Sequence, residues 1–237
     1  MKHQADYLST NCSSLDRIMG GGIPRGHVTL VYGEANTGKS SLALQCAVVC
    51  ARKNLKTIFI DSDNTFSTTR LSQIANRDLD HVSPLIFISK PRSFHEQSLL
   101  IENLDEYISK DIALIVVDTI TSLYRLELGA IEKTFILNRE LNRQVAYLVQ
   151  TAKTHNIAVI LISQVRGVIQ DDKQQMEPVA KRVLKFWAHS ILNLKLTKKP
   201  VTREAVIEKH FDVHRVGSHC FFMPEKAGIV DLSQYTT

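Results

Sequence analysis

The sequence has few of the residues and patterns that mark secreted or membrane proteins. Its cysteines are too dispersed along the chain for a zinc cluster, since they stand at Cys12, Cys46, Cys50 and Cys220. We predict reduced thiols in the core, although Cys46 and Cys50 share a helix face at i, i+4, which keeps a metal or redox role as the alternative. No apolar run approaches the ~18 residues of a membrane span, and residues 1–11 lack the basic and then apolar pattern of a signal peptide. We therefore expect a cytoplasmic protein without a membrane partner.

The composition is unremarkable except for the distribution of charge. A chain of 237 residues, 44% hydrophobic and 22% charged, predicts one globular domain over residues 1–237, and it contains no internal repeat or low-complexity tract. Positive charge is concentrated in residues 164–200, with 8 Lys and Arg against 3 Asp and Glu, whereas residues 1–163 hold 17 against 16. A basic segment on a nearly neutral body favours binding to a phosphate polymer, and a solvated basic face is the alternative.

A phosphate-binding loop is the strongest motif. Residues 33–40 fit the pattern G-x-x-x-x-G-K-[ST], between a strand-like run at 28–32 and an apolar helical segment. The glycines allow successive backbone N–H groups to point at one phosphate, Lys39 adds a charge for the β and γ phosphates, and Ser40 offers a hydroxyl to Mg²⁺. A glycine turn that matches by chance is the alternative. The predicted nucleotide contacts are Gly33, Glu34, Ala35, Asn36, Thr37, Gly38, Lys39, Ser40 and Ser41.

Apolar β-branched runs alternate with helical patterns along most of the chain. This alternation predicts an α/β fold, with a twisted, mostly parallel sheet covered by helices on both faces. After Pro200 the pattern changes to short strands, which we expect to pair antiparallel at one edge of the sheet. The predicted strands are 28–32, 57–61, 85–89, 113–118, 157–163, 205–208 and 220–223, and the predicted helices are 39–53, 93–109 and 131–155.

Polar residues end three of the predicted parallel strands, at the sheet edge where ligands bind in such folds. Asp118 is expected to hold the Mg²⁺ shell, with a helix or loop cap as the alternative. Asp61 and Asp63 end another strand, and one of them could orient an attacking water; an Asx turn around Asn64 is the alternative. Gln164 could touch a γ-phosphate and report its presence to the basic segment that follows.

These segments together resemble the core of the RecA/RadA recombinase family. The resemblance covers about residues 9–231. It is carried by the approach to the P-loop at 13–26, by 60–66, by 117–118 with 122–125, by 163–165 and by 205–210. The last segment, with Trp187 before it, is similar to an archaeal paralogue branch of that family. KaiC-type ATPases share the approach and the P-loop, but they usually carry paired glutamates after the second strand, which are absent here.

The resemblance implies a RecA-like core that binds ATP and Mg²⁺ and engages DNA, preferably single-stranded and without sequence preference, in recombinational repair. Arg70 would stack on the adenine, and two loops, one starting at Arg125 and one from 165 to about 182, would face the DNA. The predicted phosphate contacts are Arg125, Arg166, Lys181, Arg182 and Lys185. The nearby aromatic residues Tyr124, Phe186 and Trp187 could stack on bases, although aromatic residues beside apolar neighbours more often belong to the core.

Departures from the family pattern argue against a complete strand-exchange enzyme. Asp63 stands where the family has the glutamate that positions water, and it is one methylene shorter, so we expect very weak ATP hydrolysis. The paired glycines of the second loop become Ala180 and Lys181, and a phosphate-sensing histidine becomes Phe186. Only a leader of residues 1–12 precedes the approach segment at 13–26, so we expect neither an N-terminal helical DNA-binding domain nor the linker phenylalanine that recruits the next subunit.

We therefore expect an accessory protein that assists the main RadA recombinase and is nucleoid-associated when bound to DNA. Two other functions stay open. A KaiC-like regulatory ATPase would keep the P-loop and Asp118 but show no affinity for single-stranded DNA at moderate salt. A nucleotide-dependent interaction module would bind ATP without turnover. The sequence also leaves open whether the chain acts alone, as a homodimer or on a RadA filament.

Overall fold

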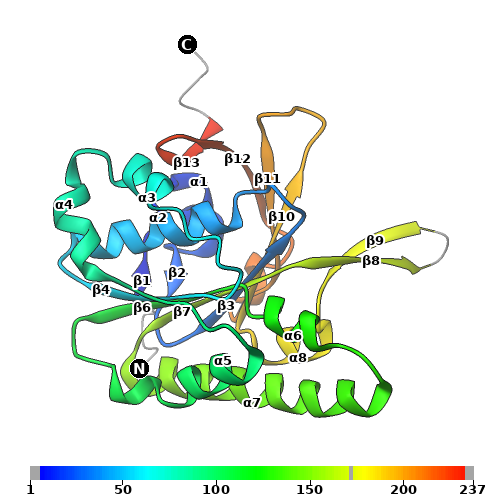
Figure 1. The fold of residues 1–237 in the computed structure, drawn as a ribbon. Helices are drawn as coiled ribbons and strands as arrows, with labels where there is room; N and C mark the ends of the chain where they lie inside the picture. Colours follow the sequence, from blue (N-terminus) through cyan, green and yellow to red (C-terminus); the bar gives the residue numbers. More distant parts are fainter. Residues whose placement is uncertain (1–5, 171–172, 233–237) are drawn as a thin grey trace.

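A twisted central sheet organises the chain. The computed structural model describes residues 6–170 and 173–232, and within them nine strands form one sheet in the order β13-β12-β11-β10-β3-β7-β6-β4-β5 (Figure 1). The strands from β10 to β5 in this order run parallel, whereas β10, β11, β12 and β13 pair antiparallel. In chain order they are β3 (Val28–Gly33), β4 (Lys56–Asp61), β5 (Ile86–Ser89), β6 (Ile112–Asp118), β7 (Ala158–Ser163), β10 (Ser190–Leu196), β11 (Arg203–Lys209), β12 (His219–Glu225) and β13 (Gly228–Asp231).

Helices cover both faces of this sheet, so that α2, α3 and α4 lie on one side and α5 and α7 on the other (Figure 1). The described helices are α1 (Ser13–Met19), α2 (Lys39–Arg52), α3 (Thr68–Ala75), α4 (Leu79–Val82), α5 (Phe94–Glu102), α6 (Ser122–Glu127), α7 (Ile131–His155) and α8 (Lys181–Trp187). Two short antiparallel pairs complete the fold: β1 (Tyr7–Leu8) with β2 (Ile23–Pro24), and β8 (Val165–Gln170) with β9 (Lys173–Pro178). None of the described helices is both long and apolar enough to span a bilayer.

The parallel strands are buried on both faces, as their continuous apolar runs predict. Every residue of β3, β6 and β7 is buried, and side chains alternate between a core beneath α2 and a core beneath α7. Helix α2 is buried from Leu42 to Ala51 because it lies between the sheet and other elements on several sides. Of the cysteines, Cys12, Cys46 and Cys50 are buried and Cys220 is half-buried, and all are free, so the predicted core thiols are confirmed.

One buried side chain of α2 bonds two segments that are far apart in the sequence. Gln45 Nε2 donates to the carbonyl oxygens of Thr10 at 2.7 Å and of Ile229 at 3.0 Å, and its Oε1 accepts the N–H of Ile229. The amide therefore bonds the leader and β13 to the helix that follows the P-loop.

Several segments differ from the sequence-based expectation, among them a predicted helix and one strand of the central sheet. The predicted helix over 93–109 ends at Glu102, because Asn103 adopts a non-helical conformation and the chain continues as a 3₁₀ turn at Leu104–Glu106. Strand β10, which was not predicted, lies between β3 and β11; its apolar pattern is interrupted by Asn193, whose amide Nδ2 donates to the carboxylate of Glu208 at 3.0 Å. A polar residue satisfied inside the sheet removes the periodic signal without removing the strand.

The predicted DNA-facing loop from 165 to about 182 is not an irregular loop. It forms the antiparallel pair β8 and β9, and helix α8 begins at Lys181. In Figure 1 the pair projects beyond the sheet on the side of α6 and α8.

Candidate nucleotide site and basic groove

The P-loop connects β3 to α2 in a conformation that requires its glycines. Gly33 has φ +154°, and a Cβ there would lie 2.0 Å from the carbonyl oxygen of Leu194. Gly38 has φ +95° immediately before α2, in the left-handed region that favours glycine. Asn36 also has a positive φ, 62°. A loop with alternating backbone handedness before a helix N-terminus presents several N–H groups to one anion, so these residues fit a phosphate group.

Lys39 lies under this loop. Its Nζ is 2.8 Å from the carbonyl oxygen of Gly33 and 2.7 Å from that of Glu34. Burial lowers its pKa from the ordinary value, and the nearby carboxylates of Asp118, Asp63 and Glu34 oppose that shift. The amine therefore lies within the electrostatic field of the strand-end carboxylates.

Three aspartates lie at the carboxyl ends of β4 and β6, and the structure separates their roles. Asp61 accepts the backbone N–H groups of Thr65 and Phe66, both at 3.0 Å, and lies 3.4 Å from Lys90 Nζ. It holds its own loop, so the Asx-turn interpretation applies to Asp61. Asp63 makes no such backbone bonds among the described residues and remains the carboxylate of this pair that could orient water.

Asp118 is almost completely buried and has no cation bound to its carboxylate among the described side chains. Burial raises its pKa to about 6, Asp63 and Asp61 add to that shift, and the Ser40 hydroxyl and Lys39 oppose it. A buried carboxylate and a hydroxyl are the oxygen donors that Mg²⁺ prefers, so Ser40 and Asp118 fit such an ion.

Gln164 joins the strand ends to the second half of the site. Its Nε2 lies 3.3 and 3.5 Å from the two carboxylate oxygens of Asp63, and its Oε1 accepts a hydrogen bond from the Arg125 guanidinium. The three side chains form a continuous chain of contacts from β4 through the end of β7 to α6.

Arg70 lies beside the start of α2. Its guanidinium donates to Ser41 Oγ at 3.3 Å and to the carbonyl oxygens of Glu225 and Lys226 at 2.6 and 2.8 Å, and burial lowers its pKa. The predicted adenine contact is thus held at the turn between β12 and β13. Its stacking on adenine stays a prediction.

A second arginine reaches the P-loop without any local sequence signal. Arg203 of β11 donates from Nε to the carbonyl oxygen of Asn36 at 2.9 Å. The two residues are far apart in the chain and lie in different motifs, so only the antiparallel extension of the sheet brings them together.

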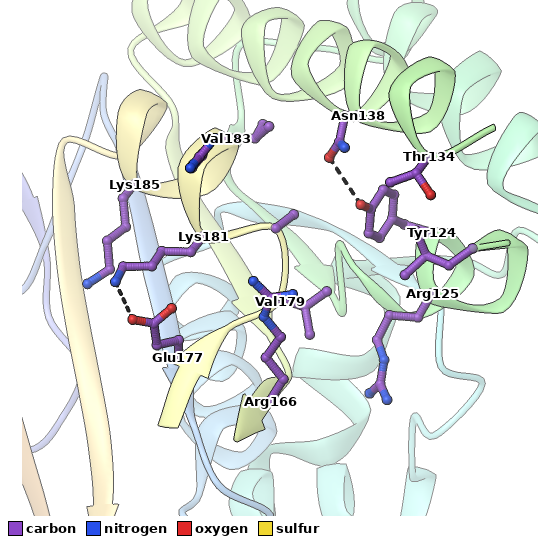
Figure 2. A pocket seen from close by; sticks show the side chains of 13 residues that line it. Tyr124, Arg125, Thr134, Asn138, Arg166, Glu177, Val179, Lys181, Val183 and Lys185 are labelled. Carbon is purple, nitrogen blue, oxygen red and sulfur yellow. Dashed lines mark hydrogen bonds and ion pairs between the residues drawn. The ribbon is translucent and has the colours of Figure 1, made fainter. Parts of the chain in front are cut away.

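All the predicted DNA contacts line one groove. It has a volume of about 760 Å³ and lies between α6, the start of α7, the base of β8 and β9, and α8 (Figure 2). The cationic residues that line it are Arg125, Arg166, Lys181, Arg182 and Lys185. Side chains from separate elements therefore converge on one basic surface.

The groove cations are not equally available. Lys181 is paired with Glu177, as Figure 2 shows, and Lys185 Nζ lies 2.7 Å from Glu208 of β11. Glu208 also accepts a hydrogen bond from Tyr32. Arg166 and Arg182 are exposed and have no ion pair with the carboxylates that the structure describes.

The aromatic residues near the groove divide into core and surface. Tyr124 is buried and donates to Asn138 Oδ1 at 3.0 Å (Figure 2), and Trp187 is half-buried and donates to Asn142 Oδ1 at 2.7 Å. Phe186 is 72% exposed, so it is the aromatic side chain of the three that is open to a base. The core interpretation applies to Tyr124 and, in part, to Trp187.

One of the two residues that replace the family's paired glycines, Ala180, keeps a glycine-like backbone, whereas Lys181 is helical. Ala180 has φ 53° and ψ 37°, the left-handed conformation, at the start of α8. This conformation costs a non-glycine residue about 1 kcal/mol or more.

The fold and the loop define a RecA-like P-loop protein. The Rad51 family profile matches residues 2–232. The DNA repair and recombination protein RadB of Thermococcus kodakarensis is 37% identical over 229 residues, 95% of this chain and 99% of that protein. The RadB of Methanosphaera stadtmanae is 33% identical over 205 residues, 86% of this chain and 87% of that protein. A crystal structure of the RadB recombinase matches with a TM-score of 0.82 at 34% identity, covering 95% of this chain and 99% of that one.

The chain belongs to the Rad51 family, within its archaeal RadB branch. The resemblance to recombinases and the RecA-like α/β fold that the sequence predicts are both confirmed. The names of the relatives support a role in DNA repair and recombination.

Proposed function

We propose that the protein is an accessory factor of recombinational repair that binds ATP at the P-loop and single-stranded DNA in the basic groove. The observation that carries the proposal is the direct contact between the two sites. Arg125 lines the groove and bonds Gln164, and Gln164 in turn donates to Asp63 beside the P-loop. A phosphate in the groove would compete with Gln164 for the guanidinium of Arg125. A movement of Asp63 on nucleotide binding would act on the same arginine through Gln164.

The chain's own groups account for binding of the nucleotide. The P-loop N–H groups and Lys39 bind the phosphates, and Ser40 and Asp118 are the residues that would hold Mg²⁺. When bound, Mg²⁺ supplies neutralisation of phosphate charge. Asp63 is the side chain that would orient water, and it is one methylene shorter than the family's glutamate and already engaged by the Gln164 amide. We expect hydrolysis to be very slow, so that bound ATP acts as a long-lived signal.

The partner that fits this activity is the main RadA recombinase with single-stranded DNA. The groove cations without a carboxylate partner, Arg125, Arg166 and Arg182, would contact phosphates, and phosphate contacts carry no sequence information, so the binding should be independent of sequence. The shortened Asp63, together with Ala180 and Lys181 in place of the family's paired glycines and Phe186 in place of its histidine, favours an accessory role over strand exchange.

Binding of a labelled oligonucleotide, followed by fluorescence anisotropy with and without ATP and Mg²⁺, tests the proposal. Replacing Lys39 with alanine should weaken ATP binding by ~10-fold to 100-fold, because a charged hydrogen-bond donor to phosphate is lost. Lys53→Ala, at the exposed far end of the same helix, is the matched control and should leave ATP affinity unchanged. Undiminished ATP affinity in Lys39→Ala would reduce the loop to a turn, and absence of DNA binding at moderate salt would favour a KaiC-like regulatory ATPase.

One observation favours a second function. Because both oxygens of Asp63 face the Gln164 amide, the carboxylate has a partner without water. This arrangement favours a nucleotide-dependent interaction module that never hydrolyses ATP. Single-turnover phosphate release distinguishes it from a slow ATPase.

A further inference from the structure

A buried chain of polar side chains crosses the core between the end of β4 and α7. Ser62 Oγ donates to Gln97 Oε1 at 2.7 Å, and Gln97 Nε2 donates to Gln144 Oε1 at 2.8 Å. Gln144 Nε2 then donates to Ser98 Oγ at 2.6 Å. Gln97 and Gln144 are 0% exposed, Ser98 2% and Ser62 5%, so water does not reach these bonds.

One end of this series of hydrogen-bonded side chains, at Ser62, lies next to the strand-end carboxylates of the candidate ATP site. Ser62 stands between Asp61 and Asp63, and the N–H groups of Ser62 and Asp63 donate to the carbonyl oxygen of Asp118 at 2.9 and 3.4 Å. Gln97 Nε2 also donates, at 3.3 Å, to the carbonyl oxygen of Ile120, two residues after Asp118. One amide on α5 therefore bonds both loops that carry the carboxylates.

The other end lies on α7, the helix that borders the basic groove. Gln144 stands two residues after Asn142, and the side chain of Asn142 accepts the indole N–H of Trp187 on α8. One turn earlier, Asn138 lines the groove and accepts the hydroxyl of Tyr124. The side chains of one helix thus contact the polar chain, α8 and the groove wall.

The side-chain amides of Gln97 and Gln144 fix each other's orientation through their hydrogen bonds. A glutamine in the core is satisfied only while its oxygen accepts and its nitrogen donates, and an orphaned buried amide is costly. If Ser62 moves with the Asp63 loop, Gln97 must turn or follow, and Gln144 loses its donor unless α7 adjusts. An apolar core at this place would pack equally well without linking these movements.

We propose that Gln97 is a positioning residue of the ATP site, and that its hydrogen bond to Gln144 couples the position of the Asp63 loop to the position of α7. Gln97 sets where the Asp63 loop stands relative to Asp118, and occupation of the ATP site is transmitted through the two glutamines to the wall of the groove. This inference rests on the proposed binding of ATP. It assigns a role to residues that touch neither nucleotide nor DNA.

The test uses the single tryptophan of the chain, Trp187, as reporter of the junction between α7 and α8. In the wild type, adding ATP with Mg²⁺ should change the fluorescence of Trp187. Gln97→Met and Gln144→Met remove the amides at similar side-chain volume and should abolish this change, while ATP affinity stays within about threefold because the P-loop is intact. Single-turnover phosphate release by Gln97→Met should slow by ~10-fold or more.

Two further variants keep the test decisive. Gln45→Met removes another buried glutamine of a helix, one that does not join the polar chain, so it should lower stability but keep the fluorescence response. Ser62→Ala removes a single hydroxyl, and it should abolish the response even if the glutamine variants fail to fold. A wild type that binds ATP without a fluorescence change, or glutamine variants that keep the change, would overturn the inference. A wild type that does not bind ATP would instead refute the proposed function.

Discussion

The number of phosphates that the basic groove neutralises can be measured from the salt dependence of DNA binding. Two groove lysines are paired with glutamates, which leaves three cations to release counterions: Arg125, Arg166 and Arg182. For single strands, log affinity falls with log salt at a slope of about −0.7 per neutralised phosphate. Three contacts therefore predict a slope near −2, or about a 20-fold loss of affinity between 50 and 200 mM salt, whereas five contacts would give about −3.5 and a loss of more than ~100-fold.

Two paired variants separate these cases. Replacing Arg166 and Arg182 together with alanine should reduce the slope to about −0.7. Replacing Lys181 and Glu177 together with glutamine removes an ion pair without changing the net charge, so it should leave the slope unchanged. Lys198→Ala with Lys199→Ala, away from the groove, is the control for loss of two charges. Anisotropy of a labelled oligonucleotide over a salt series gives all four slopes. Equal slopes in the wild type and the arginine variant would refute the assignment, and a lower slope in the Lys181 and Glu177 variant would show that the pair opens on DNA.

Three other variants test separate parts of the structure. Asp63→Glu should raise steady-state phosphate release by at least ~10-fold, about 1.4 kcal/mol of barrier, with ATP affinity unchanged; a slower variant would contradict the role of Asp63. Ala180→Gly should raise the free energy of unfolding by up to about 1 kcal/mol in urea titrations, because the left-handed conformation costs glycine less, and no gain would mean that the residue is not strained. Burial alone would raise the pKa of Asp231, but hydrogen bonds from the Ser14 hydroxyl and from the N–H groups of Ser14 and Ser13 at the start of α1 outweigh it and lower the pKa from 3.8 to about 2. Its contribution is fully present above pH 3.8 and lost as the pH falls through 2, so Asp231→Ala should cost about 1 kcal/mol at pH 7 and nothing once the pH is well below 2.

Sequence alone predicts the parts of the fold and of the site that depend on neighbouring residues. The P-loop is a local pattern, and the doubly buried strands are continuous apolar runs, so both were predicted at nearly their observed bounds. Arg203 and Gln97 were not singled out, because their partners Asn36 and Ser62 lie in other elements. The pairing of Lys185 with Glu208 likewise depends on where β11 joins the sheet. Charges and motifs can be identified from neighbouring residues in the sequence, whereas the availability of a charge for a ligand depends on tertiary contacts.

The bonds of Gln45 have a consequence for the order in which the fold can be completed. One amide nitrogen bonds the carbonyl groups of both Thr10 and Ile229, which belong to segments far apart in the sequence. Strand β13 is synthesised after the other strands that the structure describes, so the buried amide lacks its bonds to Ile229 until β13 docks, and an orphaned buried amide is costly. Helix α2, which follows the P-loop, therefore gains its complete set of bonds only after the rest of the described sheet has been synthesised.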